Sequence, residues 1–305
     1  MPPIRYGDDI ENLQHDETRL IEDIVAQMRA TQAANAERHR HAHRDAHAKS
    51  HAILKGRMTV HEDLAPELSQ GIFFPGAEYE VVARLSSAPG DIHSDEIPAP
   101  RGIALKVLGV PGDRLTPTIG GANQDFLMVN FPVLAFGTVQ KYKKMLALLE
   151  KNANAPDSFQ KLVAAAARGA EDVIEALGGK PGATLLGLAR DNANMLGETF
   201  HTQAALRYGD HVAKLSIAPE GGVVDLTDAK VESGFSAMRD AVGAYLAEND
   251  ATYTLRAQLC TDLEQMPVAA DAGQEPDPRT VGRPGGRARG PVPIAGQDAG
   301  DPAER

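Results

Sequence analysis

Residues 79–86, with the sequence YEVVARLS, and residues 101–107, with the sequence RGIALKV, decide the fold class. In both stretches apolar side chains occupy every second position: Tyr79, Val81, Ala83, Leu85, Ile103, Leu105 and Val107. Neighbouring positions of a strand face opposite sides of a sheet, so this alternation predicts strands with one buried face.

Similar signals extend outward from these two stretches. Residues 52–136 have a strand-like texture, broken by Pro-Gly and Gly-Gly turns, and the continuous apolar run Phe126–Val129 predicts a buried strand. Further strands are expected at 208–218 and 253–259, and helices at 138–178 and 234–246. The order predicts an α+β fold, an antiparallel β-sheet or β-barrel interrupted by a helical excursion.

The flanks of this core differ in composition. Apolar residues at helical spacing predict an amphipathic N-terminal helix that docks on the core or forms a homodimer: Leu13, Leu20, Ile21, Ile24, Val25 and Met28. We therefore divide the chain into a helical arm with a His-rich entry (1–51), a core domain (52–268, with the excursion at about 138–190) and a tail (269–305). The tail is rich in Gly and Pro, which predicts a flexible segment.

Charge and composition exclude several classes of protein. The net charge of the 305 residues is −11, which disfavours nucleic-acid binding, and the single cysteine excludes an internal disulfide. The N-terminus lacks the pattern of a signal peptide, and no run approaches the length of a membrane span. These features predict a cytoplasmic protein.

Four short motifs carry the candidate chemistry: RDAHAK (44–49), ARLSS (83–87), RGIALK (101–106) and QDFLMVNFPV (124–133). A histidine at the entrance of a strand, His47, suits proton transfer near neutral pH. Arg84 and Ser86 share one strand face, where arginine suits a carboxylate and serine can orient a histidine. Asn130 is a polar residue inside an apolar run and needs a hydrogen bond if it is buried.

The order and spacing of these motifs resemble the catalase superfamily, especially its compact catalase-related haem proteins. In that family an arginine and the distal histidine lie three residues apart, as Arg44 and His47 do. An Arg-Phe-Ser strand, an Arg-Gly-Phe-Ala-Val-Lys strand and an Asn-Thr-Pro-Val segment follow, matching residues 84–86, 101–106 and 130–133. The resemblance is clear over about 44–136 and fainter to about 268.

The resemblance implies a catalase-like β-barrel and a haem b cofactor. It implies that His47 moves the proton of a bound peroxide, that Asn130 holds the peroxide and that Ser86 orients His47. It also implies that Arg44 and Arg84 bind the haem propionates. Without the resemblance, His47 is compatible with an ordinary packed histidine, Asn130 with a turn cap, and the two arginines with surface ion pairs.

One family feature is missing. Catalases bind the iron through a tyrosinate in an Arg-x-x-x-Tyr helix, and none of the six tyrosines here has an arginine four residues before it. Past Met266-Pro267-Val268 the Gly/Pro-rich tail replaces the expected strand and ligand helix. We interpret this as truncation or decay of the C-terminal part, through a frameshift or an altered stop.

Three functions remain open at this stage. The first expectation is a haem-dependent peroxidase or catalase-like enzyme acting on hydrogen peroxide or organic hydroperoxides. The second is a catalase fold without activity, because the tyrosine is missing, and the third is a hydroperoxide isomerase or lyase. A metal site is not predicted. His39, His43, His47 and His51 align on a helix face and equally on a strand face, but no carboxylate or cysteine completes a site of diagnostic spacing.

Overall fold

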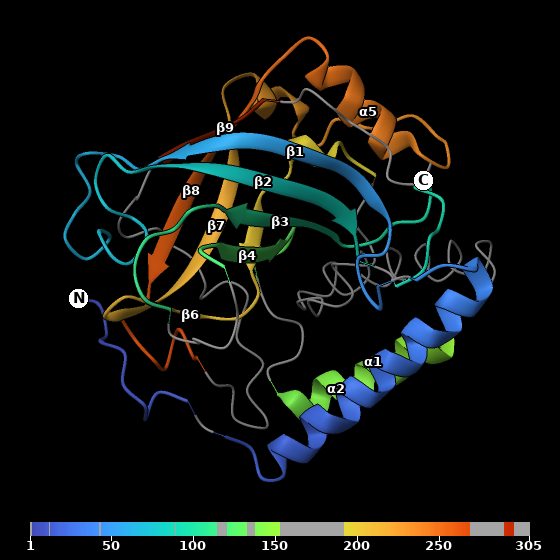
Figure 1. The fold of residues 1–305 in the computed structure, drawn as a ribbon, viewed down its shortest axis with the longest axis horizontal. Helices are drawn as coiled ribbons and strands as arrows, with labels where there is room; N and C mark the ends of the chain where they lie inside the picture. Colours follow the sequence, from blue (N-terminus) through green and yellow to red (C-terminus); the bar gives the residue numbers. More distant parts are fainter. Residues whose placement is uncertain are drawn as a thin grey trace, which may run out of the picture.

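An antiparallel sheet organises the molecule (Figure 1). The structure, a computed structural model, describes residues 2–11, 13–42, 44–88, 90–114, 121–132, 138–152, 192–268 and 290–295. Nine strands are present in these ranges: β1 Ser50–Thr59, β2 Glu78–Ser87, β3 Arg101–Val107, β4 Gln124–Val129, β5 Phe200–Thr202, β6 Leu206–Tyr208, β7 His211–Glu220, β8 Ala251–Leu259 and β9 Gly290–Ala295.

The predicted alternation is confirmed in β2 and β3. Tyr79, Val81, Ala83 and Leu85 are buried on one face of β2, while Arg84 lies on the other. The prediction for β4 is wrong in one respect. Phe126 and Met128 are buried, but Leu127 between them is 72% exposed, so this apolar run covers the core with one face only.

Strand order follows the chain over the first half of the sheet. The order is β5-β4-β3-β2-β1-β9-β8-β7-β6, and β5 also pairs with β7. The antiparallel sheet is as predicted. Strands β1 and β9, which join the two halves of the sheet, pair at only two positions, Lys55 with Ala295 and Gly56 with Ile294. Because this connection is short, closure of the sheet into a barrel stays a prediction.

Of the described helices, one packs against the sheet, at β1, and two pack against each other. The described helices are α1 Glu17–His39, α2 Val139–Asn152 and α5 Ala237–Leu246, with 3-10 turns η1 Met195–Gly197 and η2 Gly221–Leu226. Figure 1 shows α1 and α2 lying side by side, and an ion pair between Asp23 and Lys143 joins them. Of the apolar face predicted for the N-terminal helix, only Ile24 is buried; Ile21 and Val25 are exposed, and Leu13 lies before α1 and is also exposed.

The structure adds detail to two segments of the sequence analysis. The His-rich entry is neither one helix nor one strand, because His39 ends α1 and His51 lies in β1. The tail, predicted to be flexible, contributes β9, which pairs with β1 and β8. The second half of the predicted helical excursion, 153–178, lies outside the described residues.

The core lies on the inner face of the sheet. Its largest fully buried apolar side chains come from several strands and from η1, η2 and α5: Leu85, Val107, Met195, Leu196, Phe200, Ile217, Val223, Val242 and Tyr253. Within the described ranges, none of the helices has the length and hydropathy of a membrane-crossing segment.

Candidate functional site

The candidate site lies where the chain enters β1, against the adjacent ends of β2 and β3. His47 Nδ1 lies 3.1 Å from the hydroxyl oxygen of Ser86. The backbone N–H of His47 donates to the carbonyl of Ala88 at 2.9 Å. Ser86 pairs with Gly102 of β3, so a β2 side chain and a β3 backbone meet at the imidazole.

Burial sets the protonation state of His47. Burial is the largest cause that lowers the pKa of this imidazole to about 4, and the positive charges of Arg84 and then Arg44 contribute to the same shift. The ring is therefore neutral at pH 7. When Nδ1 donates to Ser86, Nε2 carries the lone pair and is available as a base.

Two guanidinium groups lie close to this histidine. Arg84, on the outer face of β2, donates from Nη2 to the carbonyl of His47 at 2.7 Å. Burial lowers the pKa of Arg84, and the nearby charge of Arg44 lowers it further, so the two cations lie near each other. Arg44 is exposed. Paired cations of this kind suit a ligand with carboxylate groups.

Asn130 lies at the end of β4 and is 2% exposed. Its side-chain Oδ1 accepts a hydrogen bond from the backbone N–H of Arg101 at 3.0 Å. The backbone N–H of Asn130 donates in turn to the carbonyl of Arg101. The preceding residue, Val129, pairs with Gly102, against which the ring of His47 lies. The register thus places Asn130 beside the site and orients its amide with Nδ2 as the donor group.

A buried polar network on the inner side of the same strands was missed by sequence reasoning. Lys49 Nζ lies 2.6 Å from Asp95 Oδ1, and His51 Nε2 lies 2.8 Å from the hydroxyl of Ser87. Arg101 pairs with Glu198 at 2.7 Å. Lys49 belongs to the first motif, but Asp95 carries no sequence signal, because only the tertiary fold brings it to Lys49.

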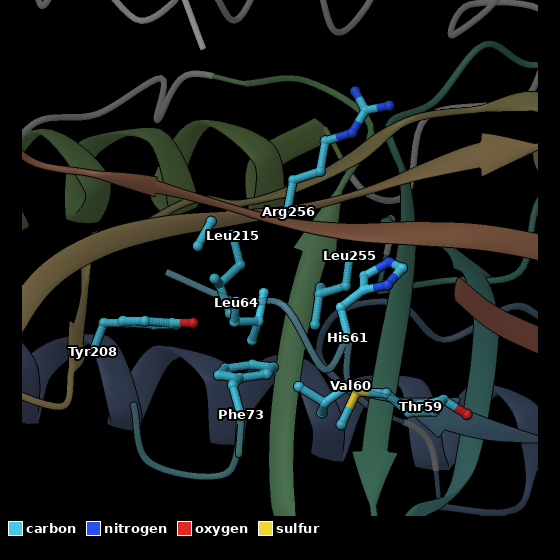
Figure 2. Close-up of a pocket in the computed structure, with 11 residues that line it drawn as sticks. Thr59, Val60, His61, Leu64, Phe73, Tyr208, Leu215, Leu255 and Arg256 are labelled. Atoms are coloured by element: carbon cyan, nitrogen blue, oxygen red, sulfur yellow. The ribbon is translucent and has the colours of Figure 1, made fainter. Parts of the chain in front are cut away.

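A separate cavity lies at the other end of β1 and is shown in Figure 2. Its walls are mainly apolar, and Figure 2 shows Phe73, Tyr208 and Leu64 around it while the guanidinium of Arg256 points away. None of the predicted site residues lines this cavity. Within the described part of the chain, no group of three or more His, Cys, Asp or Glu is placed to hold a metal ion.

The residues at His47 fit one face of a haem. A neutral imidazole, an amide donor and paired guanidinium groups match a bound peroxide and the two carboxylates of the macrocycle. Four of the six tyrosines, all of which the structure describes, are poorly suited to supply a phenolate to the other face. Tyr79, Tyr208 and Tyr253 donate their hydroxyls to backbone carbonyls, and burial raises the pKa of each and of Tyr142.

Comparison with known proteins supports the fold. No protein-family model and no curated protein matches the sequence, whereas solved catalases match the structure. A fungal catalase has a TM-score of 0.55 at 15% identity, covering 98% of this chain and 57% of its own. Catalase A from Saccharomyces cerevisiae has a TM-score of 0.51 at 15% identity, and the match covers 98% of this chain and 59% of catalase A. A bacterial catalase has a TM-score of 0.53 at 13% identity, and the match covers 96% of this chain and 54% of that catalase.

These comparisons show that the chain has a catalase-like fold. The chain spans little more than half the length of the catalases that it matches. At these identities the likeness extends to the fold and not to the activity.

Proposed function

We propose that the chain is a catalase-like haem protein that acts on hydrogen peroxide or organic hydroperoxides. The contact between His47 Nδ1 and Ser86 carries this proposal, because it fixes a neutral, half-buried imidazole at the entrance of β1. Haem b is the proposed cofactor, and a catalase-like closed barrel and a homodimer belong to the same proposal.

The proposed chemistry assigns one task to each residue. Nε2 of His47 accepts a proton from one peroxide oxygen and returns it to the other oxygen as the O–O bond breaks. Ser86 keeps the proton of the imidazole on Nδ1, and Nδ2 of Asn130 donates a hydrogen bond to the peroxide. Arg44 and Arg84 pair with the haem carboxylates. Bound haem would supply the electrons that reduce the peroxide.

The lowered pKa of His47 predicts how turnover responds to pH. A base must be unprotonated, and the pKa of about 4 keeps His47 neutral at pH 5 and above. We therefore expect turnover limited by His47 to be level from pH 7 to about 5 and to fall as the pH approaches 4. A fall centred near the ordinary histidine pKa of about 6.5 would contradict the assignment.

One observation favours a second function, a catalase-fold protein without peroxide chemistry. The phenol groups of Tyr79, Tyr208 and Tyr253 are used in hydrogen bonds to the backbone, and the pKa shifts oppose ionisation. A haem held on one face only would bind weakly and react poorly with peroxide.

Reconstitution with haem tests the two functions against each other. We would record the absorption spectrum and the rate of peroxide consumption for the wild type, for His47→Ala and for His15→Ala, whose side chain is 95% exposed. The enzyme proposal expects stoichiometric haem in all three and a rate about 10²–10⁴-fold lower in His47→Ala alone. Sub-stoichiometric haem, or a rate unaffected by His47→Ala, would support the inactive fold. Products of a lipid hydroperoxide separate reduction to an alcohol from isomerisation or cleavage.

A further inference from the structure

The backbone of His47 has an unusual conformation. Its φ is 52°, in the left-handed region that residues with a Cβ rarely adopt. Such a conformation persists only where surrounding contacts hold it, and residues held in this way concentrate at functional sites. The contacts that hold His47 therefore bear on how its imidazole is placed.

Two hydrogen bonds hold the peptide groups on either side of this residue. The N–H of His47 donates to the Ala88 carbonyl at 2.9 Å, and its carbonyl accepts from Arg84 Nη2 at 2.7 Å. The same Arg84 nitrogen lies 3.5 Å from the carbonyl of Ala48. Arg84 thus binds the backbone on the C-terminal side of His47 from a neighbouring strand.

The ring of His47 has little room for another position. A Cβ added at Gly102 would lie 2.6 Å from Cε1 and 3.0 Å from Nδ1 of the imidazole. The edge of the ring therefore fills the space of the side chain that Gly102 lacks. Ser86, two residues after Arg84 on the same face of β2, meets Nδ1. One strand consequently binds both the carbonyl and the ring of His47.

We propose that Arg84 is a positioning residue, which binds the His47 carbonyl and so keeps the imidazole against Gly102 with Nδ1 on Ser86. This inference rests on the proposed function for its catalytic meaning and goes beyond binding of a haem carboxylate. A guanidinium presents donors in a rigid planar fork, whereas the ammonium of lysine is a compact group on a flexible stem. Positive charge alone is therefore insufficient for this role.

Nuclear magnetic resonance of the haem-free chain tests the placement without any activity. We would compare the ring nitrogen shifts and the Cα shift of His47 in the wild type, Arg84→Lys and Arg84→Gln. Arg57→Lys is the matched control, because this exposed arginine of β1 pairs with Glu78 on the same sheet. In both Arg84 variants we expect a mixture of the two imidazole tautomers of His47. We also expect the Cα chemical shift of His47 to move away from the value typical of a left-handed backbone conformation.

A second variant approaches the ring from the opposite side. Gly102→Ala places a methyl group where the edge of the imidazole lies, so it should give the same tautomer mixture with Arg84 intact. Unchanged His47 signals in Arg84→Lys and Arg84→Gln would overturn the inference. If both Arg84 variants fail to fold, unchanged signals in Gly102→Ala overturn the ring placement on which the inference depends.

Kinetics of the haem-loaded chain separate positioning from carboxylate binding. Positioning predicts that Arg84→Lys lowers kcat at least about tenfold, while KM and haem affinity change by no more than about twofold. A role limited to the haem carboxylate predicts weaker haem binding with kcat preserved, which would overturn the inference. If the wild type shows no peroxide turnover, the proposed function fails, but the resonance experiment still decides the role of Arg84.

Discussion

At the scale of single residues, His51 shows what burial does to a titratable group. Its side chain is fully buried, its Nε2 lies 2.8 Å from Ser87, and its Nδ1 lies 3.9 Å from Asp95. Burial lowers the pKa of His51 to about 4, against the opposing charge of Asp95. His51 and His47 therefore both enter the folded chain as neutral rings, although only His47 faces the candidate site.

These lowered pKa values predict a pH-dependent stability. Between about pH 4 and 6.5 the unfolded state binds the proton on His51 and the folded state does not, so the free energy of unfolding falls as the pH falls. When His51 is protonated in the unfolded state and neutral in the folded state, the free energy of unfolding is lower by up to roughly 3 kcal/mol than at neutral pH.

Urea unfolding at several pH values measures this effect. His51→Gln keeps a hydrogen-bonding group beside Ser87 but does not titrate, so its stability should vary less between pH 4 and 6.5 than that of the wild type. His15→Gln, at an exposed position, is the control and should follow the wild type. Equal pH dependence in His51→Gln and the wild type would disprove the neutral buried state of His51.

At the scale of elements, a buried ion pair joins β3 to the segment after η1. Arg101 and Glu198 lie 2.7 Å apart, and their side chains are 3% and 4% exposed. Arg101 also donates to Asn192 at 3.1 Å, and its backbone is bound by Asn130. Arg101 therefore connects β3 with the segment around η1 and with the end of β4, where the proposed site residue Asn130 lies.

Removal of one partner of the Arg101–Glu198 ion pair should lower the free energy of unfolding strongly. Arg101→Met leaves the Glu198 carboxylate buried without its cation, so we expect a loss of about 3–5 kcal/mol in the free energy of unfolding. Lys106, also in β3, forms an exposed ion pair with Asp125 of β4, so Lys106→Met should cost at most about 1 kcal/mol.

Chemical denaturation of three variants checks this prediction. The double variant Arg101→Met/Glu198→Leu removes both charges and should recover much of the loss. Equal losses in Arg101→Met and Lys106→Met would mean that burial of the pair has no special weight. A double variant as unstable as Arg101→Met would mean that the loss comes from packing and not from the isolated charge.

At the scale of the whole molecule, β9 lies between the two halves of the sheet. It pairs with β8 over residues 290–294 and with β1 at two positions. Pro291 and Pro293 have no N–H to donate, which limits the hydrogen bonds that β9 can form with its neighbours. Without β9, both β1 and β8 would present unpaired edges.

Two truncations test how much the molecule depends on this strand. A chain ending at residue 268 loses β9, so we expect a lower melting temperature and a concentration-dependent increase in size, because free edges invite pairing between copies. A chain ending at residue 295 keeps β9 and is the control, expected to behave as the full chain does. Thermal unfolding and size-exclusion chromatography measure both properties. Identical behaviour of the two truncations would exclude a contribution of β9.

The sequence alone determined the local features of this protein. Alternation of apolar residues identified β2 and β3, because the two faces of a strand are set by neighbouring positions. The resemblance of the four motifs to the catalase superfamily also implied that Ser86 orients His47, and the structure places the two side chains 3.1 Å apart. The strand prediction depends on the spacing of neighbouring residues, which every sequence displays directly.

Tertiary structure decided everything that depends on contacts between distant segments. It assigned Arg84 to the carbonyl of His47, brought Asp95 to Lys49, exposed Leu127 and placed residues of the Gly/Pro-rich tail in the sheet. None of these follows from spacing, because burial and strand register arise only when separate segments pack together.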